Sequence, residues 1–158
     1  MNTDKTNLKT RIGLVDEEVT ERVLGAVFEV ANTLGAGFLE KVYERALLRE
    51  LRLRGIRVTG QAPVPVSYKG QNVGVYFADL LVEDELVVEL KCVERLANEH
   101  TAQCLNYLKA SGRSVCLLVN FQRPKVEWRR IVGGGRQDWA TDEHGLEKKG
   151  MLATDEHG

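Results

Sequence analysis

The stretch Phe77–Cys92 constrains the fold most, because it places charged residues inside two apolar runs. The runs are rich in Leu and Val, as buried strands are, and they flank an acidic turn at residues 83–85. The first predicted strand carries Asp79, and the second carries Glu89 and Lys91, which share a face because side chains alternate. A charge buried without a partner costs of the order of several kcal/mol. These three charged residues must therefore pair with one another or bind an ion.

Helical periodicity dominates the chain before this stretch. Residues 1–15 are polar and predict a flexible N-terminus, after which Asp16 is expected to cap a helix that ends at about Leu34. A Gly-Ala-Gly break follows, and a second helix is expected over residues 39–54, with Gly55 just beyond its end.

From residue 56 the period changes to two, which predicts strands. Residues 56–68 predict a strand interrupted near Pro63 and Pro65, and therefore at the edge of a sheet, because proline cannot donate a ladder hydrogen bond. A turn at 69–72 connects it to residues 73–82, so that three antiparallel strands form a meander.

The chain after Cys92 predicts one helix and two strands. The helix covers residues 97–111 and is closed by Gly112. Residues 115–121 form a nearly continuous apolar run, typical of a central strand, and residues 125–132 predict a last short strand.

This order of elements predicts an α/β (α+β) domain over residues 16–132, in which helices flank a mixed β-sheet. Residues 133–158 have no periodicity, repeat the segment ATDEHG, and predict a disordered acidic tail.

Composition limits the class of protein. No apolar run approaches the roughly 20 residues of a membrane span, and the first residues lack the apolar core of a secretory signal. The three widely spaced cysteines favour core thiols in a reducing compartment over disulfides or a zinc site, so a cytoplasmic protein is expected. The net charge of −1 gives no overall electrostatic reason to expect nucleic-acid binding.

The charges of the hairpin can be explained in two ways, and the cysteines suggest a further class of function. Two carboxylates on adjacent strands offer the oxygen ligands that Mg²⁺ prefers, and Lys91 on the same face can neutralise a substrate phosphate. Alternatively, Asp79, Glu89 and Lys91 form a structural ion pair. A thiol enzyme using Cys104 and His100, which are four residues apart on one helix, is a weaker alternative, because no residue is evident to orient the pair.

The segment 37–43, GFLEKVY, matches the motif GxxExxY, and residues 16–132 resemble the GxxExxY protein family of the PD-(D/E)XK nuclease-like superfamily. The resemblance implies a restriction-endonuclease-like core and a Mg²⁺ or Mn²⁺ cofactor. It implies Glu40, Asp79, Glu89 and the Leu90 carbonyl as metal ligands, and Lys91, Gln103 and Glu40 as catalytic residues. The superfamily's proline before the aspartate is replaced by Ala78, which is not a ligand position.

Other residues predict substrate contacts. Lys41, Arg45, Arg49 and Arg52 form a basic stripe on the second helix, which is either a solvated face or a phosphate-binding surface. His100 and Tyr107 share a helix face with Gln103 and are candidates for substrate binding or packing. Tyr43 is expected to pack in the core with its hydroxyl orienting Glu40.

We therefore expect a metal-dependent nuclease that hydrolyses DNA. The alternative is a catalytically inactive nuclease fold that binds nucleic acid or regulates a partner. No attached DNA-reading module is recognisable, so specificity would come from a homodimer or a protein partner. A membrane partner is not expected.

Overall fold

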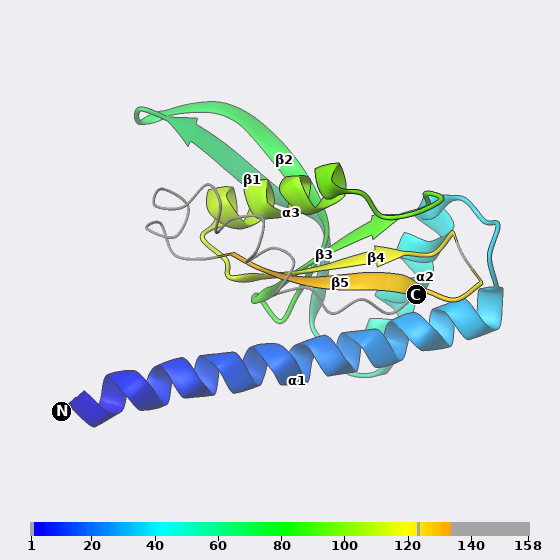
Figure 1. The fold of residues 1–158 in the computed structure, drawn as a ribbon, viewed down its shortest axis with the longest axis horizontal. Helices are drawn as coiled ribbons and strands as arrows, with labels where there is room; N and C mark the ends of the chain where they lie inside the picture. Colours follow the sequence, from blue (N-terminus) through cyan, green and yellow to red (C-terminus); the bar gives the residue numbers. More distant parts are fainter. Residues whose placement is uncertain (1, 123, 134–158) are drawn as a thin grey trace.

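The computed structural model describes the backbone of residues 2–122 and 124–133, with side chains from residue 17 onward (Figure 1). The predicted tail therefore lies outside the described residues from position 134 on. Within the described residues, no helix is long and apolar enough to cross a membrane.

Helix α1 (Asn2–Leu34) begins earlier than the sequence predicted. The prediction that the helix starts at Asp16 is wrong, because residues 2–15 continue the same helix toward the N-terminus. That segment contains no proline to interrupt the helix. Val19, Val23, Val27 and Val30 recur at helical spacing and form a buried stripe, each at most 6% exposed.

Helix α2 (Glu40–Leu53) and helix α3 (Asn98–Ser111) lie close to their predicted positions. Gly55 and Gly112 follow their ends with φ angles of 73° and 71°. This left-handed conformation suits glycine and closes a helix, so both predicted helix ends are confirmed.

Five strands form one mixed sheet in the order β1-β2-β3-β4-β5. They are β1 (Val58–Tyr68), β2 (Gln71–Val82), β3 (Leu86–Lys91), β4 (Val115–Asn120) and β5 (Glu127–Val132). The β3–β4 pair is parallel and the other pairs are antiparallel. Helix α3 makes the crossover that a parallel pair requires. The predicted α+β class, edge position of β1 and interior position of β4 are confirmed.

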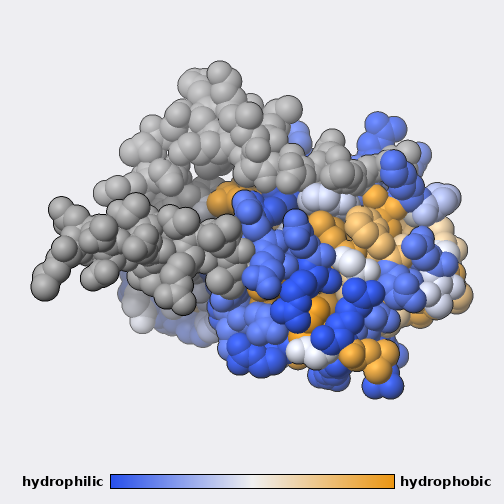
Figure 2. All heavy atoms as spheres, turned by 90° about the horizontal axis from the view of Figure 1, so that it is seen from below, coloured by the Kyte–Doolittle hydropathy of each residue, from blue (hydrophilic) through white to orange (hydrophobic). Residues whose placement is uncertain are grey.

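Helices cover both faces of the sheet (Figure 1). On one face, α1 and α2 pack against a core cluster that includes Leu47, Leu80 and Leu117. On the other, α3 packs against a second cluster that includes Leu118 and Ile131. Seen from the α1 side, the described surface is mostly hydrophilic with smaller apolar patches between (Figure 2).

The β1–β2 hairpin extends beyond the sheet and curls over α3 (Figure 1). Leu80 packs in the α1–α2 cluster, whereas Ala78 packs in the α3 cluster. Residues two apart in a regular strand point to the same side, so β2 must bend between them. The bend occurs at Asp79, where the hairpin leaves the sheet.

Candidate functional site

Asp79 and Glu89 lie on neighbouring strands. The β2–β3 register pairs Leu80 with Val88, and the two carboxylate residues stand one step further along. Oδ2 of Asp79 accepts the Leu90 backbone N–H at 2.8 Å, and Oε1 of Glu89 accepts the Asp79 N–H at 3.2 Å. Both side chains are thereby held at the bend, Glu89 buried at 3% exposure and Asp79 partly buried.

Gln61 lies across from Asp79 at this bend. The β1–β2 register passes from Gly60–Leu80 to Ala62–Ala78 without a Gln61–Asp79 pair. Gln61 has a φ of 50°, a left-handed conformation that is unfavourable for residues with a Cβ atom. The distortion directs its amide toward α2, where Nε2 donates to Oε1 of Glu44 at 2.7 Å.

Helix α2 contributes two further carboxylates. Glu40 is its first residue and Glu44 lies one turn later on the same face. Glu44 is buried and accepts a hydrogen bond from Lys41 Nζ at 3.2 Å. Burial is the main cause that raises the pKa of Glu40 and of Asp79, and the charge of Glu44 adds to both, so these carboxylates share one region.

Sequence analysis missed Glu44 and Gln61. The spacing of four residues from Glu40 could have indicated Glu44, because residues at i and i+4 share a helix face. Gln61 had no such signal, since its direction depends on a backbone distortion that the sequence does not predict.

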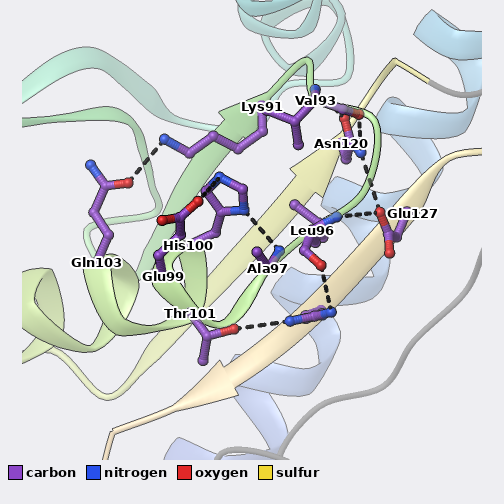
Figure 3. A network of polar contacts seen from close by, with 11 residues as sticks. Lys91, Val93, Leu96, Ala97, Glu99, His100, Thr101, Gln103, Asn120 and Glu127 are labelled. Atoms are coloured by element: carbon purple, nitrogen blue, oxygen red, sulfur yellow. Dashed lines mark hydrogen bonds and ion pairs between the residues drawn. The ribbon is translucent and has the colours of Figure 1, made fainter.

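Lys91 and Gln103 are brought together at the other end of the site. Lys91 ends β3, Gln103 lies on α3, and Lys91 Nζ donates to Oε1 of Gln103 at 2.9 Å (Figure 3). Burial raises the pKa of Glu40, Asp79 and Glu89, and the positive charge of Lys91 offsets part of each rise. The ammonium group therefore lies within electrostatic reach of all three carboxylates.

Burial and mutual repulsion disfavour the ionised carboxylates. Burial, reinforced by the Asp79 charge, raises the pKa of Glu89 to about 8. Burial also raises the pKa of Asp79, partly offset by the hydrogen bond from Leu90. For Glu40, burial and then the charge of Asp79 raise the pKa. A divalent cation would relieve this repulsion.

The donor set fits a hard cation, because it consists of carboxylate oxygens and the Leu90 carbonyl is adjacent to Glu89. Among the described side chains, however, no three His, Cys, Asp or Glu residues already form a group that could hold a metal ion. Asp79 and Glu89 instead direct an oxygen toward a backbone N–H group. Each carboxylate has a second oxygen, so these hydrogen bonds do not by themselves exclude metal ligation.

Tyr43 supports the loop before α2. Its ring is fully buried and stacks on Phe121 with centroids 4.7 Å apart. Its hydroxyl donates to the Gly35 carbonyl at 2.6 Å and accepts the Phe38 N–H at 3.2 Å. The packing prediction is confirmed, but the prediction that the hydroxyl orients Glu40 is wrong, because the loop takes up both of these bonds.

His100 and Tyr107 have structural partners. His100 Nδ1 accepts the Ala97 N–H at 2.9 Å and so caps α3 (Figure 3). Tyr107 is buried, and its hydroxyl donates to the Phe77 carbonyl at 3.3 Å. Burial and then the charges of Glu89 and Asp79 raise the pKa of Tyr107 to about 12, so its hydroxyl stays protonated beside the carboxylates.

A buried polar network fixes the loop after Lys91 (Figure 3). Asn120 is fully buried, accepts the Val93 N–H at 3.0 Å and donates to the Val93 carbonyl at 2.8 Å. It also donates to Oε1 of Glu127, which accepts the Leu96 N–H at 2.8 Å. Asn120 pairs with Lys91 in the β3–β4 register, so this network anchors the end of the strand that carries the lysine.

The basic stripe of α2 is exposed at Lys41, Arg45, Arg49 and Arg52. Lys41 is the member nearest Glu40, and its ammonium group is paired with Glu44. Arg45 and Arg49 follow on the next turns of the helix.

The described cysteines are all free. Cys104 and Cys116 are buried as predicted, whereas Cys92 is only partly buried. Burial and then the charge of Glu40 raise the pKa of the Cys92 thiol. A thiol enzyme is not supported, because Cys104 is 1% exposed and belongs to the core cluster beneath α3.

Comparisons with known proteins place these observations in a family context. Residues 17–131 match the family model described as PD-(D/E)XK nuclease superfamily. Among solved structures, an alkaline exonuclease from Laribacter hongkongensis is similar, with 19% sequence identity and a TM-score of 0.46. The similarity covers 71% of this chain and 61% of the exonuclease, so the chain spans under two thirds of that protein. No curated protein matches the chain.

Proposed function

The chain belongs to the PD-(D/E)XK nuclease superfamily, and from this premise we propose that it is a nuclease that hydrolyses phosphodiester bonds of DNA with Mg²⁺ or Mn²⁺. The single observation that carries the proposal is the position of Lys91. Its ammonium group is held by Gln103 within electrostatic reach of Asp79 and Glu89. A structural ion pair would instead place the lysine directly on a carboxylate. We also propose the narrower assignment to the GxxExxY family.

Asp79, Glu89 and Glu40 would hold the cation, together with the Leu90 carbonyl. When bound, the cation would acidify the attacking water and offset the charge that develops on the phosphoryl oxygens. Lys91 would stabilise the same charge from the protein side or orient the water. Gln103 would keep the ammonium group directed toward the substrate, because its Oε1 is bound to Nζ.

Helix α2 would contact the substrate backbone. Arg45 and Arg49 are exposed on the turns that follow Glu40, so a phosphate chain leaving the site could reach them. Lys41 would first have to leave Glu44. Each phosphate contact that is lost should reduce the slope of log affinity against log salt by about 0.9 for duplex DNA. His100 and Tyr107 remain proposed substrate contacts, although each has a structural partner.

A second candidate function is a nuclease fold that binds nucleic acid, alone or with a protein partner or second copy, without turnover. One observation favours it: the described carboxylates do not already form a group that could hold a metal ion. Such a protein would bind DNA equally well in the absence of metal.

Cleavage of plasmid and oligonucleotide DNA by purified protein separates the two candidates. We expect wild type to cleave with Mn²⁺ or Mg²⁺ and to stop in EDTA. Asp79→Asn and Lys91→Met should each reduce the rate by about 100-fold or more. Lys109→Met is the matched control, because Lys109 is an exposed lysine in the last turn of α3.

Two outcomes contradict the proposal. Equal cleavage by wild type and all three variants would identify a contaminating nuclease. Metal-independent binding with no cleavage of DNA or RNA would favour the second candidate.

A further inference from the structure

The β1–β2 hairpin exposes three aromatic side chains. Tyr68, Tyr76 and Phe77 are 62%, 56% and 53% exposed, and all lie on the part of the hairpin that extends beyond the sheet (Figure 1). Tyr68 and Tyr76 fall on the same side of the hairpin as Ala62 and Val64, which pack toward α3, whereas Phe77 points to the opposite side. Aromatic rings bury well in a core, so two of them exposed on one face of a projecting element indicate a binding surface.

This surface is continuous with the candidate site. The Tyr76 ring packs edge-on against the Tyr107 ring, with centroids 5.7 Å apart. The Tyr107 hydroxyl donates to the Phe77 carbonyl, and Asp79 follows Phe77 by two residues on the same strand. A ligand lying along the hairpin would therefore lead into the carboxylates.

The charge of the hairpin suits a polyanion. Residues 58–78 contain no Asp or Glu, and the turn carries Lys69, whose Nζ lies 5.4 Å from the centroid of the Tyr68 ring. A phosphate chain would meet no repulsion along this element and one cation at its tip.

The hairpin is poorly suited to adding another β-strand. Pro63 and Pro65 lie on the edge strand β1 and cannot donate ladder hydrogen bonds. Gln61 further distorts this edge with its left-handed backbone. A ligand that uses flat π faces, and needs no backbone partner, is the better fit.

We propose that Tyr68 and Tyr76 form a stacking platform for unpaired bases, and that the substrate is therefore single-stranded DNA or a single-stranded end. In a duplex the π faces of internal bases are already stacked, whereas unpaired bases can stack on protein aromatics. This inference rests on the proposed nuclease function and specifies its substrate.

Binding measured without turnover tests the inference. Fluorescence anisotropy in EDTA would follow a labelled single-stranded oligonucleotide and a duplex of the same sequence. Tyr68→Leu and Tyr76→Leu keep apolar bulk but remove the aromatic face. Each should raise the dissociation constant for the single strand by about 5- to 100-fold and leave duplex binding nearly unchanged. Tyr76→Phe should bind like wild type, because it retains the ring.

Val73→Ala is the matched control, since Val73 is 60% exposed on the same strand as Tyr76 but has no π face. The three substituted side chains, Tyr68, Tyr76 and Val73, are exposed, so the melting temperatures should stay close to that of wild type.

Three results would overturn the platform. The first is single-strand binding by the two leucine variants that equals that of wild type. The second is an equal loss of single-strand and duplex binding. The third is a change of sedimentation mass with unchanged DNA binding, which would identify a self-association surface. If these occur while metal-dependent cleavage persists, only the platform fails. If wild type neither binds nor cleaves any DNA, the proposed nuclease function fails as well.

Discussion

The carboxylates of Asp79 and Glu89 each accept a backbone N–H from the strand that carries the other residue. The two acidic side chains therefore stabilise the pairing of β2 with β3, which brings them together. The same pairing places two negative charges near each other.

A divalent cation should stabilise the folded protein. A ligand that binds only the folded state adds about 2.7 kcal/mol at a hundredfold excess over its dissociation constant. We expect Mn²⁺ or Mg²⁺ to raise the melting temperature of wild type by several degrees in a calorimetric or fluorescence melt. Glu89→Gln should abolish the increase because it removes a proposed ligand.

The ion-pair alternative makes the opposite prediction. If Glu89 only paired with Lys91, the cation would have no effect and Glu89→Gln would destabilise the protein. A wild-type melting curve that does not respond to millimolar Mn²⁺ would rule out a metal site of useful affinity.

The metal-free protein should lose stability as the pH rises from about 4.5 to about 8. Burial raises the pKa of Glu89 from 4.5 in the unfolded chain to about 8 in the folded protein. Between these values the folded state binds the proton more tightly, so the free energy of unfolding falls as the pH increases. Urea denaturation in EDTA at several pH values would measure this slope, which Glu89→Gln should flatten.

Glu83 provides the matched control for the pH series. The Arg57 backbone N–H and guanidinium lower the pKa of Glu83 below 4.5. Its contribution therefore has the opposite sign: stability is present above pH 4.5 and is lost as the pH falls through the lower folded pKa. Glu83→Gln should leave the slope between pH 4.5 and 8 unchanged. If both variants have the wild-type slope there, the assignment to Glu89 is wrong.

Asn120→Ala should be strongly destabilising. The fully buried amide makes two bonds to Val93, accepts the Gln122 N–H and donates to Glu127. Glu127 would keep the Leu96 N–H, but the Val93 N–H and carbonyl would lose these bonds. Each unsatisfied buried group costs about 1–3 kcal/mol, so we expect a loss of at least about 3 kcal/mol in urea denaturation. Gln122→Ala, at an exposed neighbouring position, should change stability by less than about 0.5 kcal/mol. A small loss for Asn120→Ala would show that the loop is held by other contacts.

Asp84→Gly should stabilise the protein. Glu83 and Asp84 occupy the centre of the β2–β3 turn with φ angles of 52° and 55°, which glycine adopts without a Cβ clash. The gain should be about 0.5–1 kcal/mol, because the greater freedom of glycine in the unfolded chain offsets part of the relief. Thermal melts can compare it with Asp84→Ala, which keeps the Cβ. An alanine variant as stable as the glycine variant would contradict this explanation.

Local patterns predicted most of the architecture. The two prolines placed β1 at the edge, Gly55 and Gly112 marked helix ends, and the apolar run at 115–121 indicated an interior strand. Each of these signals comes from the backbone preference of one residue or from the spacing of apolar residues over a few positions. Both can be read from neighbouring residues in the sequence. The start of α1 was missed because Asp16 is also acceptable inside a helix.

The site was predictable only where charge appeared in an apolar context. Asp79, Glu89 and Lys91 stood out for that reason. The bend at Asp79 was not predictable, because it is evident only from the packing of Ala78 and Leu80 on opposite sides of the sheet. Gln61 reaches Glu44 through the backbone distortion at that bend, and no local pattern reveals it, whereas the i, i+4 spacing from Glu40 could have indicated Glu44.

The parallel pairing of Lys91 with Asn120 also has a consequence for the order in which the site assembles during folding. Asp79 and Glu89 are joined by a short turn, so their strands can meet after closing a small loop. The end of β3 is fixed only when the chain has passed through α3 and returned as β4, which closes a much longer loop at a greater entropic cost. We therefore expect the acidic half of the site to form early and its lysine to become anchored late. Refolding intermediates, if populated, would then contain the two carboxylates without a positioned ammonium group, and the protein would gain activity only at the last cooperative step.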